Sequence, residues 1–340
     1  MTPQNSSEYI LSVCIPTYNR PKEFERMLRG VLPQITNEVE IVVRDDGPND
    51  EAKKAFDFLA AGKAINFNYI KGEKIGLDAA NLFLIENARG KYIWWFSDDD
   101  EMRPGAIAKV LELVKSNIDI SFIWANFSVY GNKNSTILRD DGFFIDGSEV
   151  LDVLGTNIGL LSTLIFSRNE ALQSLPQARK HIKGFSFAGL VPLLTVLSGS
   201  GRFYFLKGPY VVAHPTTSEE FKRAFVKNGK IENIAFNSYG IDFFTIVKEF
   251  EGKFKKRSIR KLLATNFGAL WRGMVVAWIG GWDTPIGKRW KMFTLYWDFP
   301  EFWLAIPVFL LPLSVNAFLY KIYKIFFSHR KWKFGKKNIR

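Results

Sequence analysis

The sequence predicts an α/β fold in which a mostly parallel sheet is covered by helices on both faces and is followed by a helical C-terminal region. Three observations lead to this prediction. Short apolar runs alternate with segments of helical periodicity over the first 170 residues or so. The segments between the runs have the length of the helical crossovers that parallel strands require. Beyond residue 252 the composition becomes basic and aromatic.

The predicted elements follow one another in a regular order. The first strand is expected at Leu11–Ile15. The first helix opens at Pro21, a residue favoured in the first helical turn, and its apolar residues recur at helical spacing. A strand rich in β-branched residues follows at Val39–Val43. The later elements are a helix near Asp50–Ala60, a strand near Ile65–Ile70, a helix near Asp78–Ala88, a strand at Tyr92–Phe96, a helix at Pro104–Lys115, and strands at Ser121–Tyr130 and Leu161–Ser167.

The composition excludes several classes of protein. With 47% hydrophobic and 24% charged residues, the chain is expected to fold rather than to remain disordered. The single cysteine, Cys14, excludes an internal disulfide framework and a cysteine-rich zinc site, and three histidines exclude a histidine-rich metal site. The first nine residues lack the basic start and apolar core of a secretory signal, so the N-terminal part of the chain is expected in the cytosol.

The net charge of +12 comes from the last quarter of the chain. Residues 251–340 contain 18 of the 46 Lys and Arg residues but only 4 of the 34 Asp and Glu residues. The same region holds seven of the ten tryptophans. Cations mixed with aromatic rings suit a membrane interface or a nucleic acid, so both partners stay open at this point.

The segment 302–320 is uncharged over 19 residues, a length of about 28 Å as a helix, which is enough to cross a bilayer. Basic clusters flank it on both sides, however, and Pro307 and Pro312 interrupt it. We therefore expect residues 252–340 to lie in the interface of an anionic membrane, or to enter and leave it on one side. A buried core helix is the alternative.

Two acidic clusters directly follow predicted strands. Asp45, Asp46 and Gly47 come after the second strand, and Asp98-Asp99-Asp100 comes after the fourth. Ligands of such sheets bind at the carboxyl ends of the strands. Acidic residues in this position can also be simple helix N-caps, but two clusters at one edge favour a site.

Three successive carboxylates repel one another unless a cation compensates them. The simplest compensation is Mg²⁺ or Mn²⁺, which takes one or two carboxylates and completes its shell with phosphate oxygens and water. The chain has no Walker-type loop and no G-x-G-x-x-G fingerprint after the first strand, which argues against an NTPase or an ordinary dinucleotide oxidoreductase.

Four segments in this order resemble the family 2 glycosyltransferases, nucleotide-sugar enzymes of the GT-A fold. They are 12–20 (SVCIPTYNR), 41–47 (IVVRDDG), 76–81 (GLDAAN) and 90–100 (GKYIWWFSDDD). The last segment looks most like the branch that serves bacterial surface polysaccharides, including abequosyltransferase-like enzymes. The resemblance covers roughly residues 9–215.

The resemblance implies roles for individual residues. Asp46, supported by Asp45, would contact the base or ribose of the nucleotide. Asp98 would reach the ribose or the metal, Asp100 would ligate the metal, and His214 would approach the metal or the diphosphate. The other residues implied to bind the nucleotide sugar are Pro16, Thr17, Asn19, Arg20, Lys74, Asn81 and Asp99.

The sequence departs from the family pattern at two places. Ala80 stands where the family often has an arginine, and Lys74 is expected to supply that positive charge. The segment 183–190, where relatives carry an acidic pair that includes the catalytic base, has no carboxylate. The base is therefore unassigned. His181 is the candidate we retain, and the alternatives are Asp146, Glu149 and Asp152.

The sequence thus predicts three regions, a GT-A catalytic domain at 1–215, a connecting helical segment at 216–251 and a membrane-associating region at 252–340. The resemblance implies an inverting, metal-dependent glycosyltransferase at the cytoplasmic face of the bacterial inner membrane. Its donor would be a nucleotide-diphospho-sugar and its acceptor a lipid-linked saccharide of cell-surface polysaccharide or O-antigen synthesis. A sugar nucleotidyltransferase and a non-catalytic nucleic-acid-binding protein remain the alternatives, although no nucleic-acid partner is expected.

Overall fold

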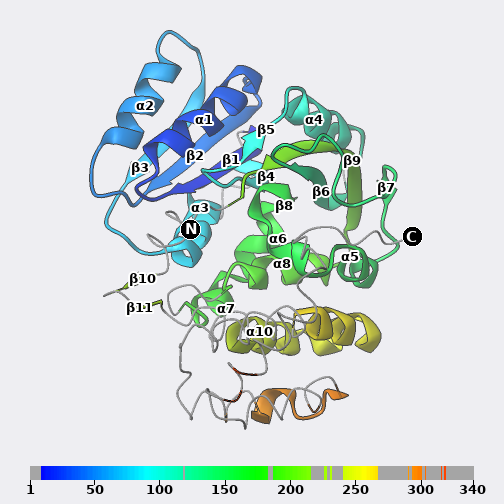
Figure 1. The fold of residues 1–340 in the computed structure, drawn as a ribbon. Helices are drawn as coiled ribbons and strands as arrows, with labels where there is room; N and C mark the ends of the chain where they lie inside the picture. Colours follow the sequence, from blue (N-terminus) through cyan, green and yellow to red (C-terminus); the bar gives the residue numbers. More distant parts are fainter. Residues whose placement is uncertain are drawn as a thin grey trace, which may run out of the picture.

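The computed structural model describes residues 9–117, 119–182, 187–215, 226–227, 230–231, 240–266, 290, 293–300, 303, 315 and 318. Within these residues a nine-stranded sheet forms the centre of the molecule (Figure 1). Its main strand order is β3-β2-β1-β4-β8-β6-β9-β5, with β7 paired to β9. The strands are β1 (Tyr9–Thr17), β2 (Val39–Asp45), β3 (Asn66–Lys71), β4 (Gly90–Trp95), β5 (Glu101–Met102), β6 (Ile120–Val129), β7 (Gly142–Phe143), β8 (Leu164–Ser167) and β9 (Arg202–Ala213).

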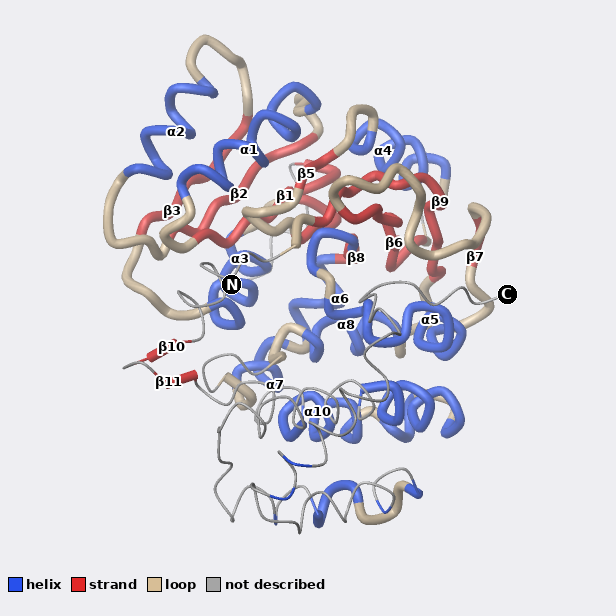
Figure 2. Tube along the Cα trace, viewed as in Figure 1, coloured by secondary structure: helices blue, strands red, loops and turns tan. Residues whose placement is uncertain are grey.

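Helices cover both faces of this sheet. In Figures 1 and 2, α1, α2 and α4 lie on one face, and α3, α6 and α8 lie on the other. The α-helices of this part are α1 (Pro21–Val31), α2 (Glu51–Ala60), α3 (Leu77–Asn87), α4 (Ala106–Ser116), α5 (Gly147–Leu154), α6 (Arg168–Gln173), α7 (Leu175–Arg179) and α8 (Leu190–Leu197). Three short 3₁₀ turns join them, η1 (Leu32–Gln34), η2 (Gly155–Gly159) and η3 (Leu161–Thr163).

The N-terminal half confirms the predicted alternation of strands and helices. β1 is buried along almost its whole length, as its continuous apolar run predicts for a central parallel strand. It pairs in parallel with both β2 and β4. In α1 the buried residues Phe24, Met27, Leu28 and Val31 recur at helical spacing, and Pro21 occupies the first turn.

The prediction of a mostly parallel sheet was wrong for the second half, because the sheet is mixed. β8 runs antiparallel to both of its neighbours, β4 and β6. The reason lies in the turn before it. η3 lies beside the carboxyl end of β4, where the Ser97 backbone N–H donates to Ser162 Oγ at 2.9 Å. β8 therefore starts at that edge and runs back along β4.

The C-terminal region is partly described. β10 (Val226–Lys227) pairs with β11 (Lys230–Ile231), and α10 (Phe243–Glu249) packs against α8. Residues 256–266 are helical. Tyr296 is fully buried, and its hydroxyl donates to the Gly240 carbonyl at 2.9 Å, which ties residues 293–300 to the chain before α10.

Among the described residues, no helix has the length and apolar character that crossing a membrane requires. The uncharged segment 302–320 lies outside the described residues except for Trp303, Val315 and Phe318.

Candidate active site

The ends of β1, β2 and β4 bring the two acidic clusters to one edge of the sheet. Thr17, the last residue of β1, is in register with Asp45, the last residue of β2. The chain after β4 continues along β1, since the Phe96 backbone N–H donates to the Cys14 carbonyl at 2.9 Å. Thr17 then joins the clusters, because its hydroxyl donates to Asp98 Oδ2 at 2.8 Å. The predicted juxtaposition at the carboxyl edge is therefore present.

The three successive aspartates point to three different sets of donors. Besides Thr17, Asp98 has Arg20 Nη1 3.4 Å from its Oδ1. Asp99 accepts from the same guanidinium at 2.7 Å and from the Ser97 hydroxyl. Asp100 accepts from the Ser162 hydroxyl at 2.6 Å and from the His214 backbone N–H at 3.0 Å. Arg20 thus neutralises Asp99, while Asp100 is held by neutral donors.

Both outer carboxyls of the triplet are buried, with 5% of Asp98 and 4% of Asp100 exposed. Burial raises the pKa of Asp98 to about 7 against the opposing effect of Arg20. Burial, followed by the neighbouring Asp99 carboxylate, raises the pKa of Asp100 to about 7. Two buried carboxyls of this kind favour either a proton or a bound cation.

The second cluster is held rigidly. Asp45 is fully buried and accepts from the Gly47 backbone N–H at 2.7 Å, from the Tyr69 hydroxyl at 2.8 Å and from Lys71 Nζ at 2.9 Å. Its role in this structure is to fix the turn after β2. Asp46 accepts one hydrogen bond on each of its oxygens among these contacts, so each oxygen can accept one more.

Arg44 orients Asp46 and was not predicted from the sequence. Its Nε donates to Asp46 Oδ1 at 2.7 Å, and its guanidinium lies 4.7 Å from the Phe83 ring centroid. On its other side is Gly72, where an added Cβ would lie 2.3 Å from the guanidinium. Glycine is required here because the planar guanidinium passes directly against the backbone.

The loop after β1 borders this edge of the sheet. Asn19 has a φ of +54°, a left-handed conformation that asparagine tolerates better than most residues. Pro16 lies within β1 in register with Arg44. Lys74, expected to supply the positive charge of the missing arginine, is exposed and lies with its ammonium 4.0 Å from the Tyr18 ring centroid. The structure thus places Lys74 at the same loop as Asn19.

The start of α3 meets the start of α8 near the end of β4. The buried Asp78 carboxylate accepts from the Gly189 backbone N–H, with 3.3 Å between Oδ1 and N. Gly189 packs against the Trp95 ring, which an added Cβ would approach to 3.4 Å. Asn81, one turn after Asp78, is 2% exposed, and its Oδ1 has no hydrogen-bond partner among the residues that the structure describes. The third predicted segment therefore contributes two buried polar side chains, of which only Asn81 was predicted.

The two histidines predicted for the site have different surroundings. His214 follows β9, and its ring nitrogen Nε2 lies 2.7 Å from Glu101 Oε1, while its ring centroid lies 4.3 Å from that of Tyr130, with the two rings tilted by 31°. Only its backbone N–H contacts Asp100. His181 follows α7, and its Nε2 lies 3.1 Å from Glu249 Oε2 on α10. His214 is thus at the acidic edge, and His181 contacts the C-terminal region.

Asp98 and Asp100 fit a divalent cation by their chemistry. Each oxygen of the two carboxylates accepts one hydrogen bond in the contacts above and retains a lone pair for a metal. In the described part of the chain, no three His, Cys, Asp or Glu side chains come together as a metal site. The cation would therefore need oxygens from a bound diphosphate and from water, as Mg²⁺ and Mn²⁺ sites commonly have.

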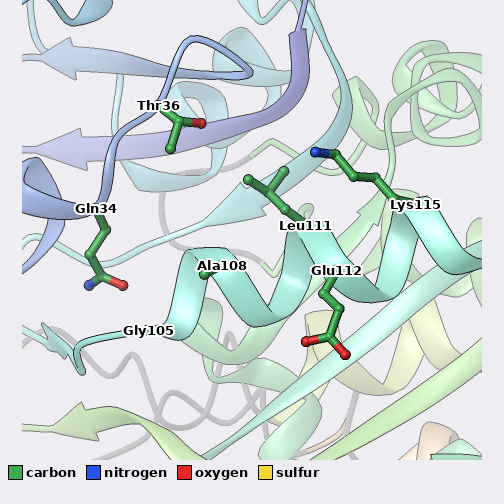
Figure 3. Close-up of a pocket in the computed structure, with 7 residues that line it drawn as sticks. All are labelled: Gln34, Thr36, Gly105, Ala108, Leu111, Glu112 and Lys115. Atoms are coloured by element: carbon green, nitrogen blue, oxygen red, sulfur yellow. The ribbon is translucent and has the colours of Figure 1, made fainter.

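A separate hollow of about 470 Å³ lies along α4 (Figure 3). It is lined by residues of the η1 region, including Gln34 and Thr36, and by residues of α4, including Glu112 and Lys115. None of the acidic-edge residues lines it. We therefore identify the candidate active site from the acidic edge and not from this hollow.

Comparison with known proteins gives similar glycosyltransferases. The profile of glycosyl transferase family 2 matches residues 12–170. The abequosyltransferase of Salmonella typhimurium is 22% identical over 254 residues, which cover 69% of this chain and 76% of that protein. A glucosyltransferase of Campylobacter jejuni, named for the acceptor GalNAc(5)-diNAcBac-PP-undecaprenol, is 28% identical over 34% of this chain and 37% of its own length.

Other relatives match over a smaller part of their length. The matched region spans 26% of an uncharacterized glycosyltransferase of Rickettsia conorii and 32% of an uncharacterized protein of Mycobacterium tuberculosis. Among solved structures, S. aureus TarS 1–349 in complex with UDP-GlcNAc superposes with a TM-score of 0.60 at 14% identity, covering 85% of this chain and 80% of that one. The segment 12–170, which carries Asp45, Asp46 and the Asp98–Asp100 triplet, therefore matches glycosyl transferase family 2, and the chain has a GT-A-like fold with a mixed sheet.

Proposed function

We propose that this protein transfers a sugar from a nucleotide-diphospho-sugar to a hydroxyl of a lipid-linked saccharide in the synthesis of a bacterial surface polysaccharide. The observation that carries the proposal is the buried pair Asp98 and Asp100 at the end of β4, on the same sheet edge as Asp46. The family match favours sugar transfer over nucleotidyl transfer.

The donor nucleotide would lie across the ends of β1 and β2. Asp46 is the proposed contact for the base or ribose, because Arg44 and the Ile75 backbone N–H orient both of its oxygens and leave each able to accept once more. Thr17 and Asn19, at the end of β1 and in the loop after it, would line the adjacent side of the nucleotide site. Asp45 supports this arrangement through its three donors and does not itself need to touch the nucleotide.

Asp98 and Asp100 are the residues proposed to hold Mg²⁺ or Mn²⁺ with the diphosphate. When bound, such an ion neutralises the charge that develops on the leaving diphosphate. Ser162 and the His214 backbone N–H fix the direction of the Asp100 carboxylate. Arg20 keeps Asp99 neutralised and so reduces the repulsion within the triplet.

A membrane-bound acceptor is supported by the exposed surface of the C-terminal region. In the helical segment 256–266 the apolar residues Ile259, Leu262 and Leu263 are buried, whereas the exposed side chains are almost all basic. The exposed basic residues from 253 to 261 are Lys253, Lys255, Lys256, Arg257, Arg260 and Lys261. We propose that this face contacts anionic headgroups at the cytoplasmic face of the inner membrane.

The proposed function is tested by a panel of UDP-, GDP-, CDP- and dTDP-sugars. Because a ligand that binds only the folded state raises its stability, one family of nucleotides should raise the melting temperature in the presence of Mn²⁺ and less in EDTA. The same nucleotide sugar should then be consumed when extracted bacterial lipids are supplied as acceptor. Stabilisation by no member of the panel, with or without Mn²⁺, would contradict the proposal.

A further inference from the structure

Three of the four base candidates considered from the sequence make contacts that hold outer helices in place, and the fourth, Asp152, lies on α5. The Asp146 carboxylate caps α5 by accepting from the Glu149 backbone N–H at 2.9 Å and also pairs with Lys255. Glu149 accepts from Arg139 at 2.7 Å and from the Ile145 backbone N–H. His181 pairs with Glu249 on α10. Each of these three groups thus has a structural explanation on an outer helix.

Asp99 and Asp100, which follow β4, are also held by hydrogen bonds to other elements. Asp99 is turned toward Arg20 in the loop before α1, and its backbone carbonyl accepts from Arg26 on α1. Asp100 is turned toward Ser162, before β8, and toward His214, after β9. These contacts involve neither α3 nor α8, and a different carboxylate lies between those two helices.

Asp78 is that carboxylate. It lies in the first turn of α3, three residues after Ile75, whose backbone N–H donates to Asp46 Oδ2 at 2.9 Å. Gly76, between them, has a φ of +88°, which lets the chain turn sharply into the helix. The carboxylate then reaches Gly189 at the start of α8, beside Trp95 at the end of β4. Asp78 is thus linked to Asp46 through the short chain segment from Ile75, and to the end of β4 through Gly189, which packs on Trp95.

The C-terminal region approaches the site from the same side. α10 packs against α8, and Phe243 at its start lies 5.6 Å from the Phe187 ring, two residues before Gly189. In Figures 1 and 2, α10 lies on the α3 and α8 face of the sheet, beyond α8. An acceptor carried by the C-terminal region would therefore arrive on the side of Asp78.

We propose that Asp78 is the general base of the transfer, an inference that rests on the proposed function. The Asp78 carboxylate takes the proton of the acceptor hydroxyl while the acceptor oxygen forms its bond to the anomeric carbon. The bond from that carbon to the β-phosphate oxygen breaks, and the leaving diphosphate keeps the electron pair. The proton then passes from the Asp78 carboxyl to solvent.

The test compares Asp78→Asn with Asp78→Glu and with the matched control Glu86→Gln on the same helix. Asparagine keeps an oxygen that can accept from the Gly189 N–H, so this structural contact would survive the change, whereas proton abstraction would not. Two quantities are measured for each protein. They are the stabilisation by UDP, GDP, CDP and dTDP with Mn²⁺, and the rate of transfer from the nucleotide sugar that the wild type uses.

We expect Asp78→Asn to keep the nucleoside diphosphate stabilisation and to lose transfer by roughly 10²- to 10⁴-fold, the usual contribution of a general base. Asp78→Glu should retain part of the rate, Glu86→Gln should match the wild type, and the residual Asp78→Asn rate should lack the acid limb of the wild-type pH profile. Transfer by Asp78→Asn within about threefold of the wild type, or a loss of rate with an equal loss of nucleotide binding, overturns the assignment. A wild type that transfers no sugar contradicts the proposed function itself, which is a different result.

Discussion

Replacing Asp100 by asparagine should stabilise the metal-free protein at alkaline pH. The Asp100 pKa of about 7, compared with an ordinary value of 3.8, means that the folded state disfavours the ionised carboxylate. At 1.36 kcal/mol per pKa unit, this difference of about three units corresponds to roughly 4 kcal/mol. That figure is an upper limit, since water that enters the site lowers the penalty. Asparagine can still accept from the His214 N–H, and the Ser162 hydroxyl can turn to accept its amide N–H.

The predicted gain depends on pH in a defined direction. Because the folded pKa lies above the unfolded one, the folded protein binds more protons than the unfolded protein between about pH 4 and about pH 7. The contribution of Asp100 to stability therefore falls as the pH rises through this window and stays low above it. The advantage of the variant should be absent below about pH 4, grow across the window and remain constant above about pH 7.

The assay is urea unfolding followed by tryptophan fluorescence in EDTA, at several pH values from about 4 to about 8. The control is Asp50→Asn, because the Asp50 side chain is 71% exposed and should contribute no such pH-dependent gain. Added Mn²⁺ should stabilise the wild type more than Asp100→Asn and so reduce or reverse the difference between them. If Asp100→Asn is less stable than the wild type in EDTA at about pH 8, the argument from burial is refuted.

Two further predictions concern the support of the site and the membrane surface. Ser162→Ala removes one of the two donors that direct Asp100, so transfer should fall by roughly tenfold while nucleoside diphosphates still stabilise the protein, and an unchanged rate would contradict the positioning role. Neutralising Lys256, Arg257 and Arg260 to Gln should weaken sedimentation with phosphatidylglycerol-containing vesicles by about 100-fold, at about 1 kcal/mol for each charge near an anionic surface. The matched control neutralises three exposed basic residues of α1 and α2, namely Lys22, Arg29 and Lys54. Equal losses in both triple variants would contradict a specific membrane-facing surface.

The sequence predicted the first half of the fold well because its signals are local. β1 and β2 are buried apolar runs, and each is followed directly by polar residues where the strand ends. In parallel strands these ends share an edge, so the meeting of Thr17, Asp45 and Asp98 could be predicted without coordinates.

The rest of the site depends on contacts between residues far apart in the chain. Ser162 reaches Asp100 only because η3 starts β8 at the carboxyl end of β4, and no periodicity in the sequence gives the direction of β8. Arg44 looks like an ordinary strand residue, and its role requires Gly72 and Phe83 from other elements. Gly72, which directly follows β3, was the one local signal that could have indicated the close approach of the Arg44 guanidinium to the backbone.

The central claim is that the buried carboxylates at the end of β4 hold the leaving diphosphate of a nucleotide sugar through a divalent cation. It is tested most directly by the rate of sugar transfer for wild type and Asp100→Ala, with the donor found in the panel, in Mn²⁺ and in EDTA. We predict that the wild type transfers the sugar only with the metal, and that Asp100→Ala remains folded but has no measurable metal-dependent transfer. Full metal-dependent transfer by Asp100→Ala would contradict the account.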